Sequence, residues 1–165
     1  MLNSLFQKVL VAYNGSKSSL NAVLYGIMMA KIYGCTLKVV YVVDSASIKQ
    51  LSISKLLVAD EAEETSRSLE EDGCKNLGYV KELAAQKKIE VESEILHGAV
   101  WSEIIHSADL WKADLILIGG SVGEKPLYSV HETVSKQDSE IIGSAHCSVM
   151  VVRDPYISHK FRLLK

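Results

Sequence analysis

Five segments of the chain carry the short apolar runs that form β-strands. The predicted strands are residues 7–13, 36–44, 89–96, 114–119 and 147–153. Residues 36–44 (TLKVVYVVD) are almost continuously apolar, as is typical of a parallel strand that is buried on both faces. Residues 89–96 (IEVESEIL) instead alternate apolar and polar side chains, as is typical of a half-exposed edge strand. The pattern therefore predicts a sheet with a buried centre and at least one exposed edge.

Two intervals between the strands have the periodicity of amphipathic helices. After the first strand, apolar side chains recur at i, i+3, i+4 and i+7 as far as Gly34, a residue type that commonly ends a helix. Ser16 or Ser18 is the candidate N-cap of this helix. Residues 101–112 carry a second apolar face of the same kind. Both helices are predicted to pack on the sheet.

The remaining intervals are less regular. Residues 45–56 form a looser segment, and a long helical region follows it to about Lys88. Gly73 and Gly78 lie inside this region, where they make a break in the helix possible. A polar loop and a short helix are expected within residues 120–145.

The predicted order of elements is that of an α/β protein. Strands and helices alternate, and right-handed crossovers between buried parallel strands give an open, doubly wound sheet. We expect one domain, residues 1–154, followed by a C-terminal tail, residues 155–165, that is partly ordered at best. Ligands of such sheets bind beyond the carboxyl ends of the strands, near the switch point of the strand order.

Two loops follow predicted strands at that edge. Asn14-Gly15-Ser16 follows the first strand and Gly119–Gly123 follows the fourth, so the loops face one another if these strands are neighbours. The second loop fits G-x-S-x-G, the nucleophile elbow of serine hydrolases, with Ser121 as the nucleophile. Its glycines are equally compatible with backbone N–H groups that cradle a phosphate, or with a turn that binds nothing.

The nucleophile interpretation has little further support. A serine hydrolase needs an acid and a histidine after Ser121, and a helix that begins directly after the serine. Pro126 favours a loop there, and His146 precedes the last strand, at the amino edge of the sheet. Asp154 and His159 lie in or beside the expected tail. A Ser121 hydrolase is therefore the least favoured interpretation, and the other two remain open.

Composition and charge exclude several classes of protein. Eighteen basic and 20 acidic side chains give a net charge of −2, which argues against a nucleic-acid surface. No stretch reaches the roughly 18 apolar residues of a membrane span, and the first residues do not form a signal peptide. Cys35, Cys74 and Cys147 are far apart, without a C-x-x-C motif. We therefore expect a cytoplasmic protein with reduced thiols that binds neither nucleic acid nor membrane.

Long stretches of the sequence resemble the universal stress protein family, and together they cover most of residues 7–153. KVLVAYNGSKSSLNAVLYGIMMAKIYGCTLKVVYVVD resembles the family's opening strand, D-G-S turn, helix and second strand. HGAVWSEIIHSADLWKADLILIGG resembles its G-x-x-x-x-x-I helix and the A-D-L-I-V-M-G strand that follows. SEIIGSAHCSVMVVR resembles the closing S-E-x-V-x-x-x-A-x-C-P-V-x-V-V-R.

This resemblance implies a fold and a mode of assembly. Family members are similar to one another in a flavodoxin-like, doubly wound, five-stranded parallel sheet of order 3-2-1-4-5, of the adenine nucleotide alpha hydrolase-like type. Many are homodimers joined by antiparallel pairing of the last strand, which implies a dimer interface at residues 147–153. That interface would also cover an apolar edge strand.

The resemblance further implies a site for ATP or AMP that has two halves. One branch of the family binds ATP through G-x-x-G-x₉-G-[S/T], and the other branch is not thought to bind ATP. The adenosine half corresponds here to Ala12, Asn14, Val42 and Gly98. The phosphate half corresponds to Gly119, Gly120, Gly123 and Ser139.

The phosphate half departs from the family's ATP motif. Lys136-Gln137 stands where the motif has Gly-Ser or Gly-Thr, and a side chain there crowds a triphosphate. Asn14 replaces the acidic residue after the first strand. We therefore expect a stress-response regulatory or binding module, not a robust enzyme, whose binding of ATP is weak or absent. The alternative is a member that binds ATP or AMP through a rearranged loop, with slow hydrolysis at most.

Overall fold

Five parallel strands form one sheet at the centre of the molecule. The computed structural model describes residues 4–120 and 135–165. The strands are β1 (Lys8–Ala12), β2 (Thr36–Val43), β3 (Val91–His97), β4 (Leu115–Gly119) and β5 (Ser148–Val152). Their order in the sheet is β3-β2-β1-β4-β5, and every pairing is parallel. The predicted doubly wound sheet of order 3-2-1-4-5 is therefore confirmed.

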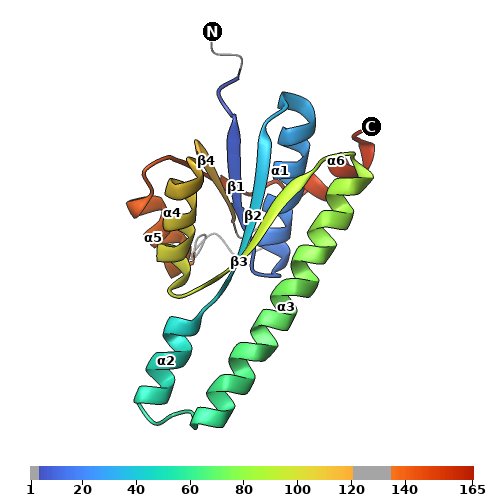
Figure 1. Cartoon of the computed structure of the whole chain (residues 1–165). Helices are drawn as coiled ribbons and strands as arrows, with labels where there is room; N and C mark the ends of the chain where they lie inside the picture. Colours follow the sequence, from blue (N-terminus) through green and yellow to red (C-terminus); the bar gives the residue numbers. More distant parts are fainter. Residues whose placement is uncertain (1–3, 121–134) are drawn as a thin grey trace, which may run out of the picture.

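Helices cover both faces of this sheet (Figure 1). The helices in the described part of the chain are α1 (Lys17–Tyr33), α2 (Ser45–Ile53), α3 (Ala59–Gln86), α4 (Val100–Trp111), α5 (Lys136–Ser144) and α6 (Ile157–Leu163). Helices α1, α3 and α6 lie on one face, and α4 and α5 lie on the other. None of the helices in the described part of the chain is both long and apolar enough to cross a membrane.

Each face of the sheet has its own hydrophobic cluster. In β1, Val9 and Val11 point into the cluster beneath α1 and α3, and Leu10 points into the cluster beneath α4 and α5. All three side chains are fully buried. Successive residues of a strand point to opposite faces, so a strand covered on both sides must be apolar at every position. This explains the unbroken apolar runs of the central strands.

The boundaries of α1 follow local chemistry. The hydroxyl of Ser16 accepts a hydrogen bond from the backbone N–H of Ser19 at 3.2 Å, so Ser16 is the N-cap. Gly34 ends the helix in the left-handed conformation at a φ of +70°, and its N–H donates to the carbonyl of Ala30. Both ends lie where the sequence predicted them.

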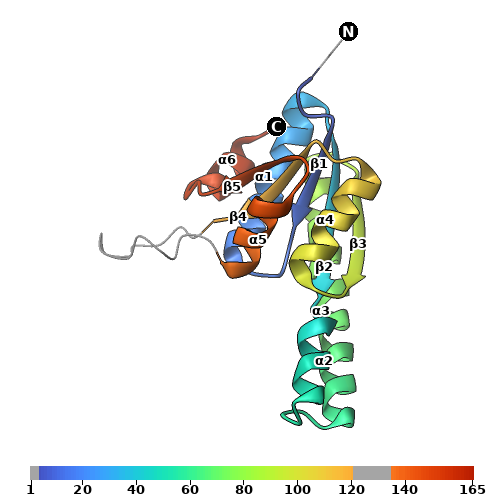
Figure 2. The same cartoon turned by 90° about the vertical axis from the view of Figure 1, so that its left-hand side faces the viewer.

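The segment after β2 is more regular than the sequence suggested. Residues 45–56 were expected to be loose, but Ser45–Ile53 form α2, capped by Asp44, whose carboxylate accepts from the N–H of Ser47 at 3.1 Å. Helix α3 is also unbroken through both of its glycines. Gly73 marks a close approach to the sheet, because a Cβ there would lie 2.8 Å from the ring of Tyr41. Together α2 and the start of α3 form a helical hairpin (Figures 1 and 2).

The C-terminal segment is also better ordered than expected. Residues 155–165 were predicted to be partly ordered at best, and this was wrong: α6 packs on α1 and closes one end of the core. Ile157 and Phe161 lie one helical turn apart, and both side chains are buried. Lys87 of the neighbouring segment donates from Nζ to the carbonyl of Leu164 at 2.6 Å. Two apolar side chains on one helix face are enough to dock this short helix.

The two edge strands differ in character. In β3 half-buried and exposed side chains alternate along most of the strand, as the period-two pattern predicted, and Glu94 pairs with Lys38 of β2 at 2.6 Å. Strand β5 exposes its first residue and half-buries the next three, all of them apolar. Charged side chains discourage further strand pairing at an edge, whereas an apolar edge favours it. Of the two edges, β5 is therefore the better candidate for pairing with another strand.

Candidate functional site

A cavity of about 310 Å³ lies at the carboxyl edge of the sheet, where the loops after β1 and β4 meet. These strands are direct neighbours, with Val9 opposite Leu115 and Val11 opposite Leu117. The order of connection reverses between them, so the helix after β1 and the helix after β4 cover opposite faces of the sheet. The cavity therefore lies at the switch point, where ligands of doubly wound sheets bind. Its volume falls at the lower end of the range for small-molecule sites.

The cavity has an apolar wall and a polar rim. Its apolar lining consists of Ala12, Val40, Val42, Val100, Ile104 and Ile141. Its polar lining consists of Tyr13, Asn14, Ser16, Ser18, Ser19, Asp44, Ser135, Gln137 and Asp138, together with the backbone of Gly119. A planar apolar ring with polar substituents fits a surface of this kind.

Asn14 is held by the first turn of α1. Its Oδ1 accepts from the backbone N–H of Ser16 at 3.0 Å and from the hydroxyl of Ser19 at 2.7 Å. A backbone N–H can only donate, so this contact fixes which end of the Asn14 amide carries the oxygen. The Nδ2 group, which has no hydrogen-bond acceptor among the described residues, is left as the donor available to a ligand.

Tyr13 fixes the rear of the same loop. Burial raises the pKa of its phenol, so the hydroxyl remains a proton donor at neutral pH. It donates to Oδ1 of Asn76 at 3.3 Å, which ties the loop after β1 to α3. The position of Asn14 is thus determined by two different helices.

Two carboxylates also line the cavity. Asp44 caps α2, and Asp138 accepts from the hydroxyl of the N-cap residue Ser135 at 2.7 Å. The described lining residues include no lysine or arginine. The N-termini of α1 and α5 border the cavity and contribute partial positive charge, but Asp138 lies in the first turn of α5 and opposes it. The field of the described lining residues is therefore poorly suited to several phosphate charges.

Protein contacts, not ligand contacts, explain two of the predicted phosphate glycines. A Cβ on Gly119 would lie 2.2 Å from the carbonyl carbon and oxygen of Ser18. A Cβ on Gly120 would lie 2.5 Å from Cγ of Arg153. The N–H of Gly120 already donates to the carbonyl of Val152 at 2.8 Å, so it is not free to bind a phosphate. Of the three interpretations of this loop, its first two glycines support the structural turn.

The predicted site residues are only partly brought together. Ala12, Asn14, Val42 and Gly119 line the cavity. Gly98 follows β3 and has a φ of +146°. Its N–H donates to the carbonyl of Val43, and the residue is not part of the lining. Gly120 is buried beside β5 and Ser139 is exposed on α5, and neither belongs to the lining. Gly123 and Ser121 lie outside the described residues.

Sequence reasoning overlooked Asp44 and Val100 as lining residues, whereas Gln137, which it placed at the position of the family's phosphate motif, does line the cavity. Asp44 directly follows β2, and Val100 begins the helix after β3. The rule that singled out Asn14, namely a polar residue at the carboxyl end of a buried parallel strand, would have found Asp44 as well.

The downstream partners for a serine nucleophile do not converge on the cavity. His146 hydrogen-bonds to Asp109 at 2.9 Å and lies just before β5, at the amino edge of the sheet. Asp154 is bound to Lys160, and this hydrogen bond holds the pKa of its carboxyl below the usual value. Neither residue lines the cavity. Among the described residues that follow Ser121 in the chain, no acid–histidine pair lines the cavity.

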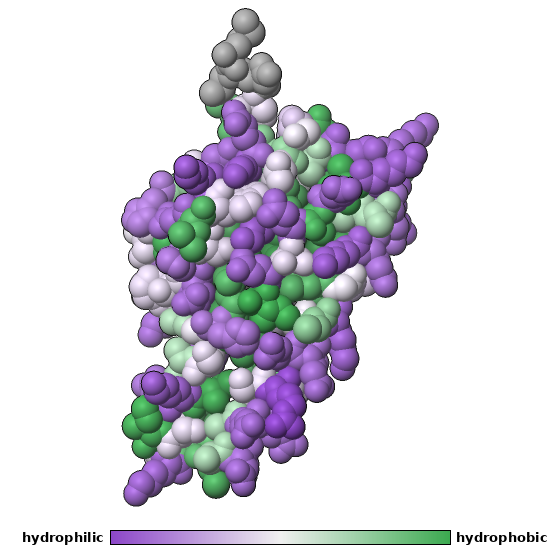
Figure 3. Space-filling model, in the orientation of Figure 1, coloured by the Kyte–Doolittle hydropathy of each residue, from purple (hydrophilic) through white to green (hydrophobic). Residues whose placement is uncertain are grey.

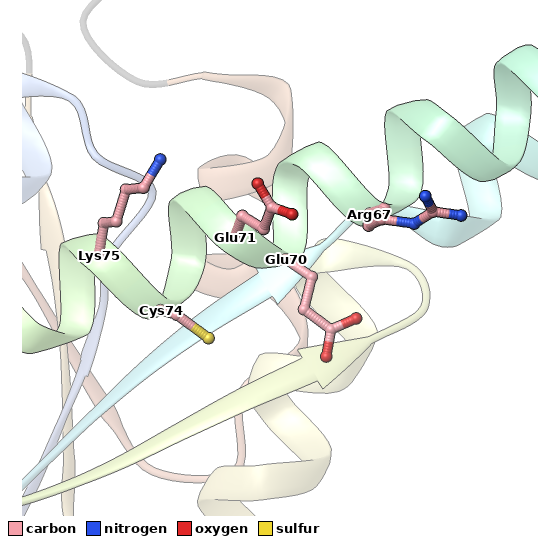
Figure 4. A pocket seen from close by; sticks show the side chains of 5 residues that line it. All are labelled: Arg67, Glu70, Glu71, Cys74 and Lys75. Carbon is pink, nitrogen blue, oxygen red and sulfur yellow. The ribbon is translucent and has the colours of Figure 1, made fainter.

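A second depression lies along α3 and contains the exposed thiol of Cys74. Its lining consists of Arg67, Glu70, Glu71, Cys74 and Lys75, all from one helix. Figure 4 shows that Glu70 and Cys74 extend from one side of the helix, and Glu71 and Lys75 from the other. Among the described residues, no group of histidine, cysteine and acidic side chains could hold a metal ion. Because its side chains diverge, this depression offers no concerted chemistry.

The other two cysteines are poorly reactive by position. Burial raises the pKa of the thiols of Cys35 and Cys147, so they remain protonated at neutral pH. All three cysteines are free.

Comparison with known proteins gives one consistent result. The family model of the universal stress protein family matches residues 5–153. A universal stress protein of Methanocaldococcus jannaschii is 30% identical over 152 residues, which cover 92% of this chain and 85% of the relative. A universal stress protein of Bacillus subtilis is 28% identical over 155 residues, which cover 90% of this chain and all of the relative.

Solved structures agree on the fold. UspA, a universal stress protein from Lactobacillus plantarum, superposes with a TM-score of 0.70 at 19% identity, covering 90% of this chain and 98% of the other. A universal stress protein family protein from Arabidopsis thaliana, solved with AMP bound, superposes with a TM-score of 0.60 at 17% identity. It covers 90% of this chain and 93% of the other.

Proposed function

The chain belongs to the universal stress protein family, and from this premise we propose that it is a regulatory binding module whose cavity accepts the adenosine part of a nucleotide. In this proposal ATP binds weakly or not at all, and the protein acts in a stress response through its ligand-dependent state, not through catalysis. Its three free cysteines support a reducing, cytoplasmic location.

One observation carries this proposal: the described lining of the cavity combines an apolar wall with two carboxylates and contains no lysine or arginine. The wall is formed by Ala12, Val42 and Ile104, with Asn14 as a donor at its rim. The N–H of Gly120 donates to the carbonyl of Val152, so it is already used within the protein. The carboxylates of Asp44 and Asp138 both line the cavity. Each added phosphate brings negative charge toward these carboxylates. Affinity is therefore expected to fall from adenosine through AMP to ATP.

The main alternative is a member that binds ATP or AMP through a rearranged phosphate loop. The AMP-bound Arabidopsis relative supports an adenine nucleotide in general, although that protein is only 17% identical. Under this alternative, the positive ends of α1 and α5 outweigh the two carboxylates. A Ser121 hydrolase gains no support from the described residues.

Titration calorimetry distinguishes the first two functions. We expect adenosine or AMP to bind with at least about tenfold higher affinity than ATP, a difference of about 1.4 kcal/mol. Val42→Phe places a ring against the cavity wall and is expected to abolish the heat of binding, whereas Leu110→Phe, on the exposed side of α4, leaves it unchanged. Micromolar binding of ATP, equal to or tighter than that of AMP, would contradict weak ATP binding and support the alternative.

We also propose that the protein is a homodimer joined through β5. This strand is an apolar edge, and its middle residues Val149, Met150 and Val151 are only half-buried in one chain. Antiparallel pairing of two β5 strands would satisfy the free backbone groups of that edge.

A charge in β5 tests this interface. Val151→Glu is expected to yield monomers, because an interfacial carboxylate would be desolvated and would face its own copy across the pairing. Leu110→Glu adds the same charge at an exposed position of α4, outside β5, and is expected to leave the dimer intact. The measurement is sedimentation velocity, with circular dichroism to show that both variants are folded. A wild-type monomer, or a dimer that persists in Val151→Glu, would rule out this interface.

A further inference from the structure

The helical hairpin after β2 contributes to the core clusters through one half-buried side chain only, that of Leu69, which lies outside the hairpin's far end. We define the α2–α3 hairpin as residues 45–72, and none of them is buried; the first buried residue of α3 is Gly73. Figures 1 and 2 show the hairpin projecting beyond the carboxyl edge of the sheet. Packing between two helices that leaves no buried side chain contributes little to stability. The hairpin is therefore a surface element whose composition is not required by the core.

Aliphatic side chains are concentrated at the end of this hairpin. We define the hairpin tip as residues 51–64. The exposed aliphatic side chains of the tip are Leu51, Ile53, Leu56 and Val58, with exposed fractions between 40 and 74%. They are four of the 12 large hydrophobic residues that are exposed in the described part of the chain, and they lie within eight consecutive positions. Single exposed aliphatics are ordinary, whereas exposed apolar side chains that gather in one patch mark sites of contact with another molecule. Figure 3 shows apolar surface at this end of the molecule.

Acidic side chains surround the apolar tip. Asp60, Glu61, Glu63 and Glu64 are all exposed in the first turns of α3, and Lys55 is the only basic residue of the tip. Residues 44–72 contain eight acidic and three basic side chains, a net charge of −5, whereas the whole chain carries −2. The rest of the chain therefore carries +3. Helix capping accounts for part of this charge, because Asp60 and Glu61 lie in the first turn of α3, but Glu63 and Glu64 lie beyond it.

We propose that the hairpin tip docks a basic amphipathic helix of a partner protein. Such a helix buries its apolar face on the four aliphatic side chains and places its lysines or arginines against the carboxylates of α3. Charge argues against the other occupants of an apolar surface. Two tips in contact bring like charges together, and anionic lipid and nucleic acid are repelled in the same way. This interaction is independent of the cavity and of its ligand.

The test uses a peptide of stated chemistry and the full chain. The probe is a fluorescein-labelled peptide of about 14 residues, built from leucine and lysine with the leucines at i, i+3, i+4 and i+7. We expect saturable binding by fluorescence anisotropy, with an affinity that falls about tenfold when salt rises from roughly 0.05 to 0.5 M, since the charges are exposed. A leucine–glutamate peptide of the same pattern is expected not to bind.

Matched variants locate the contact. The double variant Leu56→Ser, Val58→Ser is expected to weaken binding at least tenfold, because it removes the centre of the apolar tip. The double variant Glu63→Gln, Glu64→Gln is expected to reduce the salt dependence. Leu110→Ser, at an equally exposed leucine of α4, is the control that leaves binding unchanged. All of these positions are exposed, so the variants are expected to fold normally.

Three results would overturn the proposal. The first is no binding of the leucine–lysine peptide, or binding that the tip variant does not weaken. The second is equal binding of the leucine–glutamate peptide, which would indicate a merely adhesive apolar surface. The third is an assembly of the wild-type chain that Leu56→Ser, Val58→Ser dissociates in sedimentation, because the tip would then be covered by a second copy.

Discussion

Replacing Gly119 by alanine is expected to destabilise the protein by about 3 kcal/mol or more, because overpacking against atoms that cannot move is costly. The added Cβ would lie 2.2 Å from the carbonyl carbon and oxygen of Ser18 and 2.5 Å from the N of Ser19. These are backbone atoms at the N-terminus of α1, so no change of rotamer relieves the clash. Relief requires a shift of α1 away from β4, and this shift would loosen the cluster beneath α1. Urea unfolding followed by circular dichroism measures the effect.

Gly78→Ala is the matched control, with an expected effect of opposite sign. Gly78 lies within α3, and a Cβ there meets no atom within 4 Å. Alanine is favoured over glycine inside a helix by about 0.5–1 kcal/mol, so this variant should be slightly more stable than the wild type. If Gly119→Ala unfolds at the wild-type urea concentration, the close approach of α1 to the end of β4 is incorrect.

Truncation of Phe161 to alanine is expected to cost about 3–5 kcal/mol, the range for removal of a buried phenylalanine. Its ring is only 5% exposed and belongs to the cluster beneath α1 and α3. The ammonium group of Lys87 lies 4.8 Å from the ring centroid and loses this contact as well. The result measures how firmly α6 is attached to the domain, because a frayed tail would give almost no change.

Leu163→Ala serves as the control within the same helix. Leu163 is 67% exposed, and its truncation is expected to change the free energy of unfolding by no more than about 0.5 kcal/mol. Thermal unfolding monitored by circular dichroism compares the two variants with the wild type. Equal midpoints for Phe161→Ala and the wild type would contradict the docking of α6.

The sheet could be predicted from the sequence because its signals are local. A strand covered on both faces must be apolar throughout, and this constraint appears directly in residues 36–44 and 114–119. The order of the strands came from the resemblance to a family, and the structure confirms it. The sequence signals for the cap of α1 at Ser16 and for its end at Gly34 are local as well.

The short outer helices could not be predicted in the same way. Helix α6 has only a few apolar side chains, and those that become buried do so on a surface of α1 more than 120 positions earlier in the chain. Helix α2 buries no side chain at all, so its sequence carries no clear apolar period. The surface on which α6 docks is distant in the chain and is not visible in a short window of sequence, and the local cap of α2 does not predict a helix without an apolar period to support it.

The candidate site also contains some residues that the sequence reveals and others that it does not. Asn14, Ala12 and Gly119 line the cavity because they end neighbouring strands, which position in the sequence reveals. The sequence does not show why position 120 is a glycine. A Cβ added there would clash with Arg153, which lies more than 30 residues later in the chain. A glycine that makes room for a side chain and a glycine that binds a phosphate look alike in sequence. Only the surrounding atoms distinguish them.

The uneven burial of α3 has a consequence for local unfolding. From Gly73 onward the helix rests on the sheet, whereas the only core contact of its earlier turns is that of the half-buried Leu69. Amide hydrogens in residues 59–72 should therefore exchange with solvent through small local openings, while those in residues 77–84 exchange only when the domain itself unfolds. One continuous helix thus contains a pliable half and a rigid half. A molecule that orders the pliable half could slow its exchange without altering the stability of the domain.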